Sequence, residues 1–341
     1  MKKLNCAVIG MGVGERHANF YRKSKLTNLV KIYEKNRSLL KKLKKKFSSV
    51  TFVNNENEIF KDPKIDLISI ASFDNYHFGQ INKSFKYDKH VFVEKPICLY
   101  LEQLKKIYSS YKKKKYLKLS SNLLLRASPQ FEKIKNLADK KDYGKIFYLE
   151  ADYNYGRLKK ILKGWRGKIP FYSVTYGGGI HMVDQIIWLL KELPYEVKAE
   201  ANKIVTKNSK FKFNDFSVAL LKFKSGKIAK VSSNFGCNIP HHHSIKIYGT
   251  KGTLIQNLNG ANFYKSRDKQ KKATKFKNDF SKEQKNKILK NFVQSFFKKN
   301  KHNLISFKEI INSMLICFAI EKSFKTNKNV KINYEKLKIY D

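Results

Sequence analysis

The sequence has few cysteines and no long apolar segment. Its four cysteines are Cys6, Cys98, Cys237 and Cys317, and they lie too far apart to form a CxxC pair or a cysteine–histidine ligand set. This spacing argues against a zinc centre and favours reduced thiols in a cytoplasmic protein. No apolar run approaches the length of a membrane-spanning helix. The first apolar stretch is short and runs into glycines and charges, so we interpret it as a strand and not as a signal peptide.

Acidic side chains are scarce, because 27 Asp and Glu residues stand against 72 Lys and Arg residues, for a formal net charge of +45. Such an excess is typical of proteins that bind polyanions, for example nucleic acid. However, only seven of the basic residues are arginine, the side chain that phosphate and base-edge recognition favours. The lysines are also spread over most surface segments. We therefore expect no specific nucleic-acid binding, whereas the positive field favours an anionic form of a small-molecule substrate.

Apolar runs alternate with amphipathic basic segments over residues 1–122. The runs predict strands at residues 4–10, 29–34, 50–53, 65–72, 90–94 and 116–123. Strands and helices that alternate at this spacing indicate βαβ units. The sequence therefore predicts an α/β protein whose residues 1–122 form a Rossmann domain with a doubly wound parallel sheet.

The pattern changes in residues 123–341, where period-two alternation and glycine-containing turns predominate. "FKSGK" predicts a hairpin in which Gly226 takes a positive φ. We assign these residues to an α+β domain with a large, open, mostly antiparallel sheet, and its exposed aromatic face favours a homodimer or homotetramer. Residues 265–290 are expected to form a loop and a surface helix. Residues 306–326 predict a long helix that packs back between the domains.

Three glycines, Gly10, Gly12 and Gly14, join the first strand to the first helix in "AVIGMGVGERHA". Glycines at this junction allow a tight turn and let backbone N–H groups approach a pyrophosphate at the helix N-terminus. The match to GxGxxG is imperfect, because Glu15 stands where the third glycine is expected. The pattern nevertheless predicts a dinucleotide-binding turn.

An acidic residue, Glu34, ends the second strand 24 residues after Gly10. A carboxylate at this place can accept hydrogen bonds from both hydroxyls of a ribose and repels a 2′-phosphate. It therefore favours NAD over NADP. Lys35 and Arg37 lie close enough in sequence to keep NADP as the alternative.

The fifth predicted strand ends in "HVFVEKP", so it brings Glu94 and Lys95 to the carboxyl edge of the sheet, where doubly wound folds bind ligands. An ammonium there can hydrogen-bond a reacting oxygen and stabilise its negative charge. In "GGGIHMVDQIIWLL", His181 and Asp184 lie three residues apart and share one helix face. A neutral imidazole at this place can accept the proton of an alcohol.

These motifs carry a resemblance to a known family. "GxGxGERHA", "SFDNYH" (72–77), "VEKP" (93–96) and "GGGIHMVD" (177–184) occur in the order and spacing of the Gfo/Idh/MocA family (glucose–fructose oxidoreductase and inositol dehydrogenase relatives). "WRGKIP" (165–170), "YGTKGTL" (248–254) and residues 319–332 also resemble it. The resemblance implies an NAD(P)-dependent oxidoreductase that transfers hydride to or from a secondary alcohol or ketone of a sugar, an inositol or a nucleotide-linked sugar.

The same resemblance implies roles for individual residues. Lys95 and His181 are the predicted catalytic residues, and the peptide between Lys95 and Pro96 is expected to be cis, as is frequent in this family. The predicted cofactor-binding residues are Gly10, Met11, Gly12, Val13, Gly14, Glu34, Ser72, Asn75, His77, Glu94 and Lys95. The predicted substrate-binding residues are Arg126, Trp165, Arg166, Tyr176 and Asp184. We expect no metal.

One position departs from the family pattern, since Gly177 stands where the family often has an aspartate four residues before the histidine. The proton relay would then depend on Lys95 and His181, or recruit Tyr176, Tyr172 or Asp184. The departure also favours one alternative, a dinucleotide-binding regulator or structural subunit without turnover. A polyanion-binding protein is the other alternative.

The three consecutive histidines at 241–243 suggest a metal site at first sight. Neighbouring residues of a strand point to opposite faces, so three in a row cannot bind one ion. We interpret them as a junction between a loop and a strand.

Overall fold

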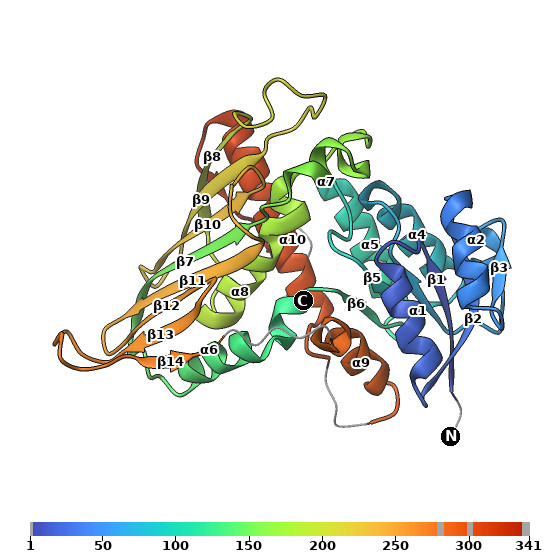
Figure 1. The fold of residues 1–341 in the computed structure, drawn as a ribbon, viewed down its shortest axis with the longest axis horizontal. Helices are drawn as coiled ribbons and strands as arrows, with labels where there is room; N and C mark the ends of the chain where they lie inside the picture. Colours follow the sequence, from blue (N-terminus) through green and yellow to red (C-terminus); the bar gives the residue numbers. More distant parts are fainter. Residues whose placement is uncertain (1–2, 278–282, 299–302, 336–341) are drawn as a thin grey trace. The chain divides into compact units, whose positions relative to one another are not determined.

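The computed structural model describes residues 3–277, 283–298 and 303–335, and the chain forms two compact units (Figure 1). Unit 1 consists of Met1–Asn122 and Lys285–Phe307, and unit 2 consists of Leu123–Gln284 and Lys308–Asp341. The predicted boundary between residues 122 and 123 coincides with the first division between the units. No helix in the described ranges is long and apolar enough to span a membrane.

Unit 1 contains a six-stranded sheet in which every pair of neighbours is parallel. The strands are β1 (Leu4–Ile9), β2 (Thr27–Tyr33), β3 (Thr51–Val53), β4 (Leu67–Ile70), β5 (His90–Val93) and β6 (Leu119–Ser121). Their order is β3-β2-β1-β4-β5-β6, which is the Rossmann order with its reversal between β1 and β4. The predicted doubly wound sheet is therefore confirmed. All four residues of β4 are buried, as expected for a strand covered on both faces.

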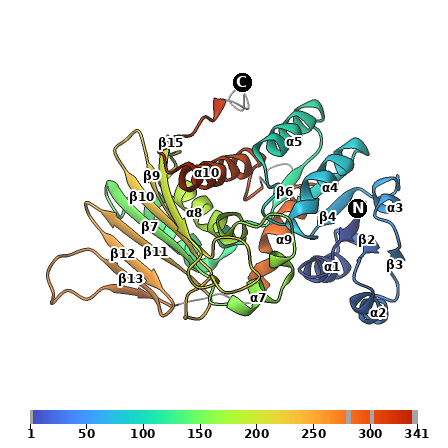
Figure 2. The same cartoon turned by 90° about the horizontal axis from the view of Figure 1, so that it is seen from above.

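Helices cover both faces of this sheet (Figure 2). They are α1 (Gly14–Lys23), α2 (Arg37–Lys46), α3 (Asn57–Phe60), α4 (Asp74–Lys86) and α5 (Leu101–Lys113). The sequence sets the start of α2 locally, because the Asn36 side chain accepts hydrogen bonds from the N–H groups of Ser38 and Leu39. Helix α1 packs on β5 through an edge-on contact of His17 with Phe92, at 5.3 Å between ring centroids.

A late segment of the chain joins unit 1, which corrects the prediction that all residues after 122 belong to the second domain. Helix α9 (Lys287–Gln294) follows the short helix η4 (Glu283–Asn286). Its Phe292 ring lies 5.9 Å from Phe92 of β5, and its buried residues also include Ile288, Leu289 and Val293. The predicted surface helix is thus amphipathic, and its apolar face covers the parallel sheet. Helix α9 belongs to unit 1 because its apolar side chains are buried against β5, which is distant in the sequence. Its position in the sequence alone therefore did not indicate the unit to which it belongs.

Unit 2 contains a nine-stranded sheet in the order β14-β13-β12-β11-β7-β10-β9-β8-β15. The strands are β7 (Ile146–Asn154), β8 (Glu196–Asn202), β9 (Phe216–Lys222), β10 (Ile228–Asn234), β11 (His242–Gly249), β12 (Thr253–Asn257), β13 (Gly260–Tyr264), β14 (Thr274–Phe276) and β15 (Val330–Lys331). Only the central pair β7–β10 is parallel. The β9–β10 hairpin turns at Gly226, whose φ is +83°. The predicted open, mostly antiparallel sheet and its hairpin are therefore confirmed.

One face of this sheet carries helices α8 and α10 (Figure 2). The helical segments of unit 2 are η1 (Leu124–Ala127), α6 (Pro129–Asp139), α7 (Leu158–Leu162), η2 (Trp165–Gly167), the π-helical turn η3 (Thr175–Gly179), α8 (Ile180–Leu190) and α10 (Phe307–Thr326), whose first residue belongs to unit 1. Ten of the eleven residues of α8 are buried. The other face of the sheet holds no helix of the described residues.

Candidate active site

The glycine turn after β1 is shaped by close packing at the reversal point of the sheet. Gly10 has φ +84°, and a Cβ atom there would lie 2.6 Å from the backbone nitrogen of Ser72. A Cβ atom at Gly14 would lie 2.9 Å from Val8 Cγ1. Gly10 therefore lets β1 approach the end of β4, and Gly14 lets α1 pack directly on β1.

The N-terminus of α1 opens beside this turn. Val13 precedes the helix and provides no side-chain hydrogen bond to its first N–H groups. A Cβ atom at Gly12 would meet no atom within 4 Å. Unpaired N–H groups at a helix start are a suitable site for a phosphate group. The turn thus has space for a pyrophosphate, and the binding of one here stays a prediction.

Glu34 lies directly after β2 and ties the glycine turn to the second strand. Its Oε2 accepts a hydrogen bond from Met11 N–H at 2.6 Å, and its Oε1 accepts one from Asn36 N–H at 2.7 Å. The backbone N–H of Met11 is therefore used inside the protein. Each carboxylate oxygen keeps further acceptor capacity, so Glu34 fits the predicted contact with ribose hydroxyls.

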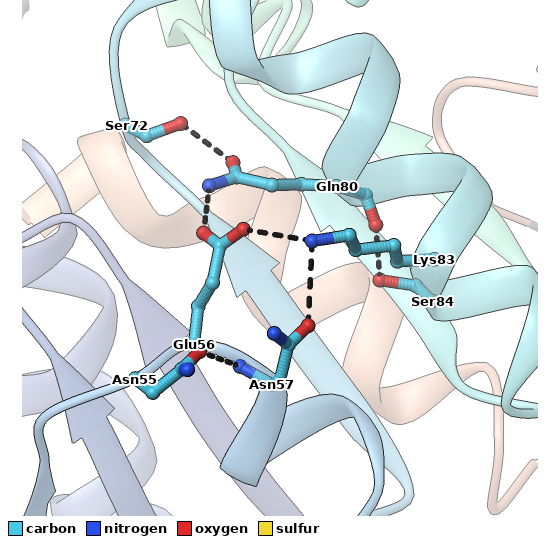
Figure 3. Close-up of polar contacts among 7 residues, drawn as sticks. All are labelled: Asn55, Glu56, Asn57, Ser72, Gln80, Lys83 and Ser84. Atoms are coloured by element: carbon cyan, nitrogen blue, oxygen red, sulfur yellow. Dashed lines mark hydrogen bonds and ion pairs between the residues drawn. The ribbon is translucent and has the colours of Figure 1, made fainter.

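Ser72, two residues after the end of β4, begins a chain of polar contacts that reaches residues Glu56 and Asn57 (Figure 3). Its hydroxyl donates to Gln80 Oε1 at 2.6 Å, and Gln80 Nε2 donates to Glu56 Oε2 at 2.7 Å. Lys83 closes the network with a 3.4 Å contact to Glu56 Oε1 and a 3.3 Å hydrogen bond to Asn57 Oδ1. The network holds the turn between β4 and α4 in place.

Two predicted cofactor residues of this turn have different environments. His77 is completely buried, and its ring nitrogens face backbone oxygens, with Nδ1 2.6 Å from Pro96 O and Nε2 3.2 Å from Ser72 O. His77 therefore joins the turn after β4 to the turn after β5, and its contact with a cofactor stays a prediction. Asn75 Oδ1 is buried and finds no hydrogen-bond partner within the described part of the chain. A buried acceptor of this kind fits a donor from a bound ligand.

We expect Gln80→Ala to weaken dinucleotide binding, because it removes the contacts that hold Ser72. The dissociation constant for NADH should rise about fivefold, which corresponds to about 1 kcal/mol for a lost hydrogen bond. A fluorescence titration with NADH measures it. Gly79→Ala is the control, because a Cβ atom there meets nothing within 4 Å. An unchanged affinity in Gln80→Ala would show that the network is not part of the cofactor site.

Lys95 follows β5 at the carboxyl edge of the parallel sheet, and its peptide bond to Pro96 is cis, as expected. The preceding residue is anchored from two sides. Glu94 Oε1 lies 3.3 Å from His17 Nε2 and accepts a 2.7 Å hydrogen bond from Asn122 Nδ2. Burial alone would raise the pKa of Glu94, but His17, Asn122 and the charge of Lys95 lower it to about 2. Glu94 is therefore an ionised anchor that fixes the strand end carrying Lys95.

His181 lies in the first turn of α8, inside a cluster of aromatic rings in unit 2. The Tyr153 ring stacks on it at 6.1 Å between centroids, and the His243 ring lies 6.4 Å away. His241 stands 5.0 Å from His243. Burial, followed by the neighbouring histidines, lowers the pKa of His243 to about 3, so its imidazole is neutral. His181 is thus held among aromatic and neutral rings.

The three histidines at 241–243 behave as the strand pattern predicted. β11 begins at His242, and the His242 Nε2 atom lies 3.3 Å from Asn154 Nδ2, whereas His241 and His243 face the Tyr153 ring. Adjacent histidines therefore point to different sides. No group of three or more metal-ligating side chains occurs in the described ranges.

Arg126 and Asp184, both predicted to bind substrate, instead bind each other. Arg126 Nε and Nη2 donate to the two carboxylate oxygens of Asp184 at 2.9 and 2.7 Å. Both side chains are at most 2% exposed, and Glu309 of α10 is a further partner of Arg126. This bidentate ion pair cross-links η1 to α8 and engages both carboxylate oxygens, which gives the two residues a structural role. Their contact with a substrate stays a prediction.

The remaining predicted substrate residues lie near the start of α8. Arg166 Nε donates to Tyr172 Oη at 3.1 Å, and the Arg166 guanidinium lies 4.7 Å from the centre of the Trp165 ring. Tyr176 is buried, and its ring contacts Phe171 and Phe318. Trp165 and Arg166 thus share a polar, partly exposed loop, whereas Tyr176 packs in the core of unit 2.

Sequence reasoning missed three contributors to these sites. His17 was not singled out, although "GERHA" places it one turn into α1, and Tyr153 and His243 were not connected with His181. Sequence alternation could have shown that Tyr153 and His243 point to the buried face of their strands. Their convergence on α8 requires the pairing of β7 with β11, which is a tertiary property.

Comparisons with known proteins identify relatives over both units. Residues 4–122 match the family model described as "Oxidoreductase family, NAD-binding Rossmann fold", and residues 131–255 match the one described as "GFO/IDH/MocA C-terminal domain". The chain is 22% identical over 341 residues to a myo-inositol 2-dehydrogenase from Thermotoga maritima, with 96% of this chain and 98% of the relative covered.

Solved structures share the fold. A levoglucosan dehydrogenase in complex with NADH and L-sorbose matches with a TM-score of 0.87 and 18% identity, over 98% of this chain and all of that chain. A scyllo-inositol dehydrogenase from Lactobacillus casei, with bound NAD(H) and scyllo-inositol, matches with a TM-score of 0.79 and 19% identity, over 97% of this chain and 99% of that one.

Proposed function

Because this chain belongs to the Gfo/Idh/MocA family of oxidoreductases, we propose that it transfers hydride between NAD and a secondary alcohol or ketone carbon of a sugar-like polyol. The observation that carries the proposal is the anchored strand end in unit 1. Glu94, His17 and Asn122 hold each other where Lys95 leaves the sheet, at the edge where doubly wound folds bind their ligands. We favour this enzyme over a regulator that binds the dinucleotide without turnover. The reason is that the contacts of Glu94 fix the position of the next residue, Lys95, as a catalytic lysine requires.

A nicotinamide held by this unit would supply the hydride acceptor or donor. Lys95 would hydrogen-bond the reacting oxygen and stabilise the negative charge that develops there. His181, which extends from the buried helix α8, would take the proton of the alcohol or return it to the alkoxide. Glu94 keeps its own charge and would orient Lys95 without exchanging a proton, since its pKa is lowered to about 2.

Three features of unit 1 support NAD as the cofactor. The helix start beyond Gly12 suits a pyrophosphate, Asn75 Oδ1 is a buried acceptor in need of a donor, and Glu34 presents a carboxylate at the end of β2. A carboxylate there accepts ribose hydroxyls and repels a 2′-phosphate. We expect NAD to support faster turnover than NADP.

The substrate class follows from the relatives, which act on inositols and levoglucosan according to their names. An anionic substrate is supported by a cluster of cations on the α7–η2 segment. The guanidinium groups of Arg157 and Arg166 lie 5.6 and 5.8 Å from the centre of the Tyr155 ring. Burial, followed by these two charges, lowers the pKa of Lys160 in α7. A carboxylate or phosphate on the sugar would be attracted to this segment.

The test is spectrophotometric NADH formation over a panel of inositols, neutral sugars, sugar acids and nucleotide-linked sugars, with NAD and NADP compared. Turnover of one class of polyol with NAD is the expected result. Tight NADH binding without turnover on any substrate would support the regulator instead. Equal initial rates with neutral and anionic sugars would remove the basis for an anionic substrate.

We further propose that the helix-free face of the nine-stranded sheet pairs two copies of the chain, in a cytoplasm that keeps its four cysteines reduced. Tyr148 and Tyr248 stack on this face at 5.7 Å, and Leu220 and Ile228 are 47% and 44% exposed. Such a patch of aromatic and aliphatic side chains is typical of an interface. We expect light scattering to give a dimer or tetramer and Leu220→Lys to lower the mass. A monomeric wild-type protein would contradict the proposal.

A further inference from the structure

The helix that carries His181 starts from a turn with three consecutive glycines. Residues 177–179 are all glycine and belong to the π-helical turn η3, and His181 follows in the first turn of α8. Close packing requires a glycine here, because a Cβ atom at Gly178 would lie 2.4 Å from the Tyr153 ring. Glycine is also among the weakest helix formers. The position of this turn, and with it that of His181, therefore depends on contacts from outside the turn.

Ser173 holds the start of the turn with two acceptors. Its Oγ accepts a hydrogen bond from the N–H of Tyr176 at 3.2 Å, and its carbonyl oxygen accepts one from the N–H of Gly177 at 2.8 Å. The first N–H groups of a helical segment have no partner inside it, and a serine hydroxyl is a common cap for them. Ser173 is buried, so its hydroxyl needs a partner of its own within the protein.

This partner is Glu321 of α10. The Ser173 hydroxyl accepts from the N–H of Tyr176 and donates its single proton to Glu321 Oε1. Glu321 is also buried, and its Oε2 lies 3.4 Å from Lys325 Nζ. Burial raises the pKa of Glu321, and a carboxyl group in either protonation state has an oxygen that accepts this proton. A directed chain of hydrogen bonds therefore links η3 to α10.

The neighbours of Glu321 on α10 contact the same segment. Phe318 and Lys325 stand three residues before and four residues after Glu321, which places them on the same helix face. The Phe318 ring lies 5.4 Å from the Tyr176 ring, and Lys325 Nζ lies 4.7 Å from the centre of the Phe171 ring. One stripe of α10 thus packs along the residues that precede the glycines.

We propose that Ser173 and Glu321 are positioning residues for His181, and that the hydrogen bond between them fixes the glycine-rich turn from which the histidine extends. Neither side chain touches the substrate or moves its proton, because they act through the backbone of η3. The inference rests on the proposed function and adds two residues to it. It explains why a buried carboxyl group of α10 faces the residues that lead into α8.

The kinetic test compares Glu321→Leu with Glu321→Gln. The leucine removes the acceptor, whereas the glutamine keeps an amide oxygen in its place. We expect kcat to fall at least about tenfold in Glu321→Leu, because a displacement of about 1 Å in a reacting group can cost about 100-fold. Glu321→Gln should recover most of the rate. NADH affinity should stay unchanged in both, because Glu321 belongs to unit 2.

Two controls accompany this comparison. Lys322→Ala changes an exposed neighbour on α10 and should match the wild type. Ser173→Ala removes the other half of the hydrogen bond and should lower kcat as Glu321→Leu does, which keeps the test decisive if Glu321→Leu does not fold. Wild-type kcat in Glu321→Leu or in Ser173→Ala would overturn the inference.

A double variant shows whether Glu321 acts through the histidine. In His181→Asn the group that Glu321 positions is absent, so adding Glu321→Leu should not lower the residual turnover further. A merely structural role would lower it by the same factor as in the wild-type background. Such an additive loss would overturn the inference.

A last test does not depend on turnover. The imidazole signals of His181 in an NMR spectrum are those that disappear in His181→Asn, and they sense the stacked Tyr153 ring at 6.1 Å. We expect them to shift in Glu321→Leu and to return in Glu321→Gln. Unshifted signals in Glu321→Leu would overturn the inference whether or not a substrate is found. Failure of the proposed function is a separate result, namely a wild-type protein without turnover on the whole panel.

Discussion

Lys95→Ala should abolish most turnover while leaving NADH binding close to that of the wild type. The ammonium is the group that would stabilise negative charge on the reacting oxygen, and its loss should lower kcat by about 10²–10⁴-fold, the range for a positioned proton-transfer or charge-stabilising group. The backbone of the strand end should stay in place, because Glu94, His17 and Asn122 hold it independently of the lysine side chain. Steady-state kinetics and an NADH fluorescence titration measure the two effects.

Two further variants separate the role of the ammonium from a general loss of positive charge. Lys115→Ala removes an equal charge from an exposed position of unit 1 and should retain full activity. Lys95→Arg keeps the charge but changes its shape and its hydrogen-bond geometry, so it should recover only part of the rate. Wild-type kcat in Lys95→Ala would remove Lys95 from the mechanism.

Arg126→Leu should lower the free energy of unfolding of unit 2 by about 3–5 kcal/mol, the cost of leaving a buried charge without its partner. Asp184 would then face an apolar side chain, and Arg126 is its bidentate partner with Nε and Nη2 at 2.9 and 2.7 Å. Burial raises the pKa of Asp184, against the effect of Arg126. Both tryptophans, Trp165 and Trp188, belong to unit 2, so denaturant unfolding followed by intrinsic fluorescence reports on this unit.

The double variant Arg126→Leu/Asp184→Leu should be more stable than Arg126→Leu alone, because it removes both buried charges. A surface pair provides the control. Lys222 and Glu196 are 2.8 Å apart and Lys222 is half exposed, so Lys222→Ala should lower the free energy of unfolding far less than Arg126→Leu does. If Arg126→Leu cost no more than Lys222→Ala, the ion pair would not be a structural element, and the predicted contact of Arg126 with substrate would regain support.

The sequence by itself determined the elements and their class, because those depend on neighbours in the chain. Apolar runs predicted the six strands of the parallel sheet to within three residues, and Gly10 and Gly226 marked turns that have positive φ. Strand β14 was not predicted, because it lies in the polar residues 265–290. The carboxyl edge of β5 followed from the proline that ends the strand. The motif spacing was then sufficient to indicate the family.

The tertiary structure decided which polar groups meet. Arg126 and Asp184 are 58 residues apart and were both expected to contact substrate, yet they neutralise each other, since an unpaired buried charge is more costly than a paired one. Helix α9 joined unit 1 because its apolar face fits Phe92. Gly177 looked like the loss of a functional group, whereas a Cβ atom there would lie 2.1 Å from Tyr172 Oη, so packing accounts for the glycine. Contacts of this kind depend on shape and burial across the fold, which no local pattern of residues encodes.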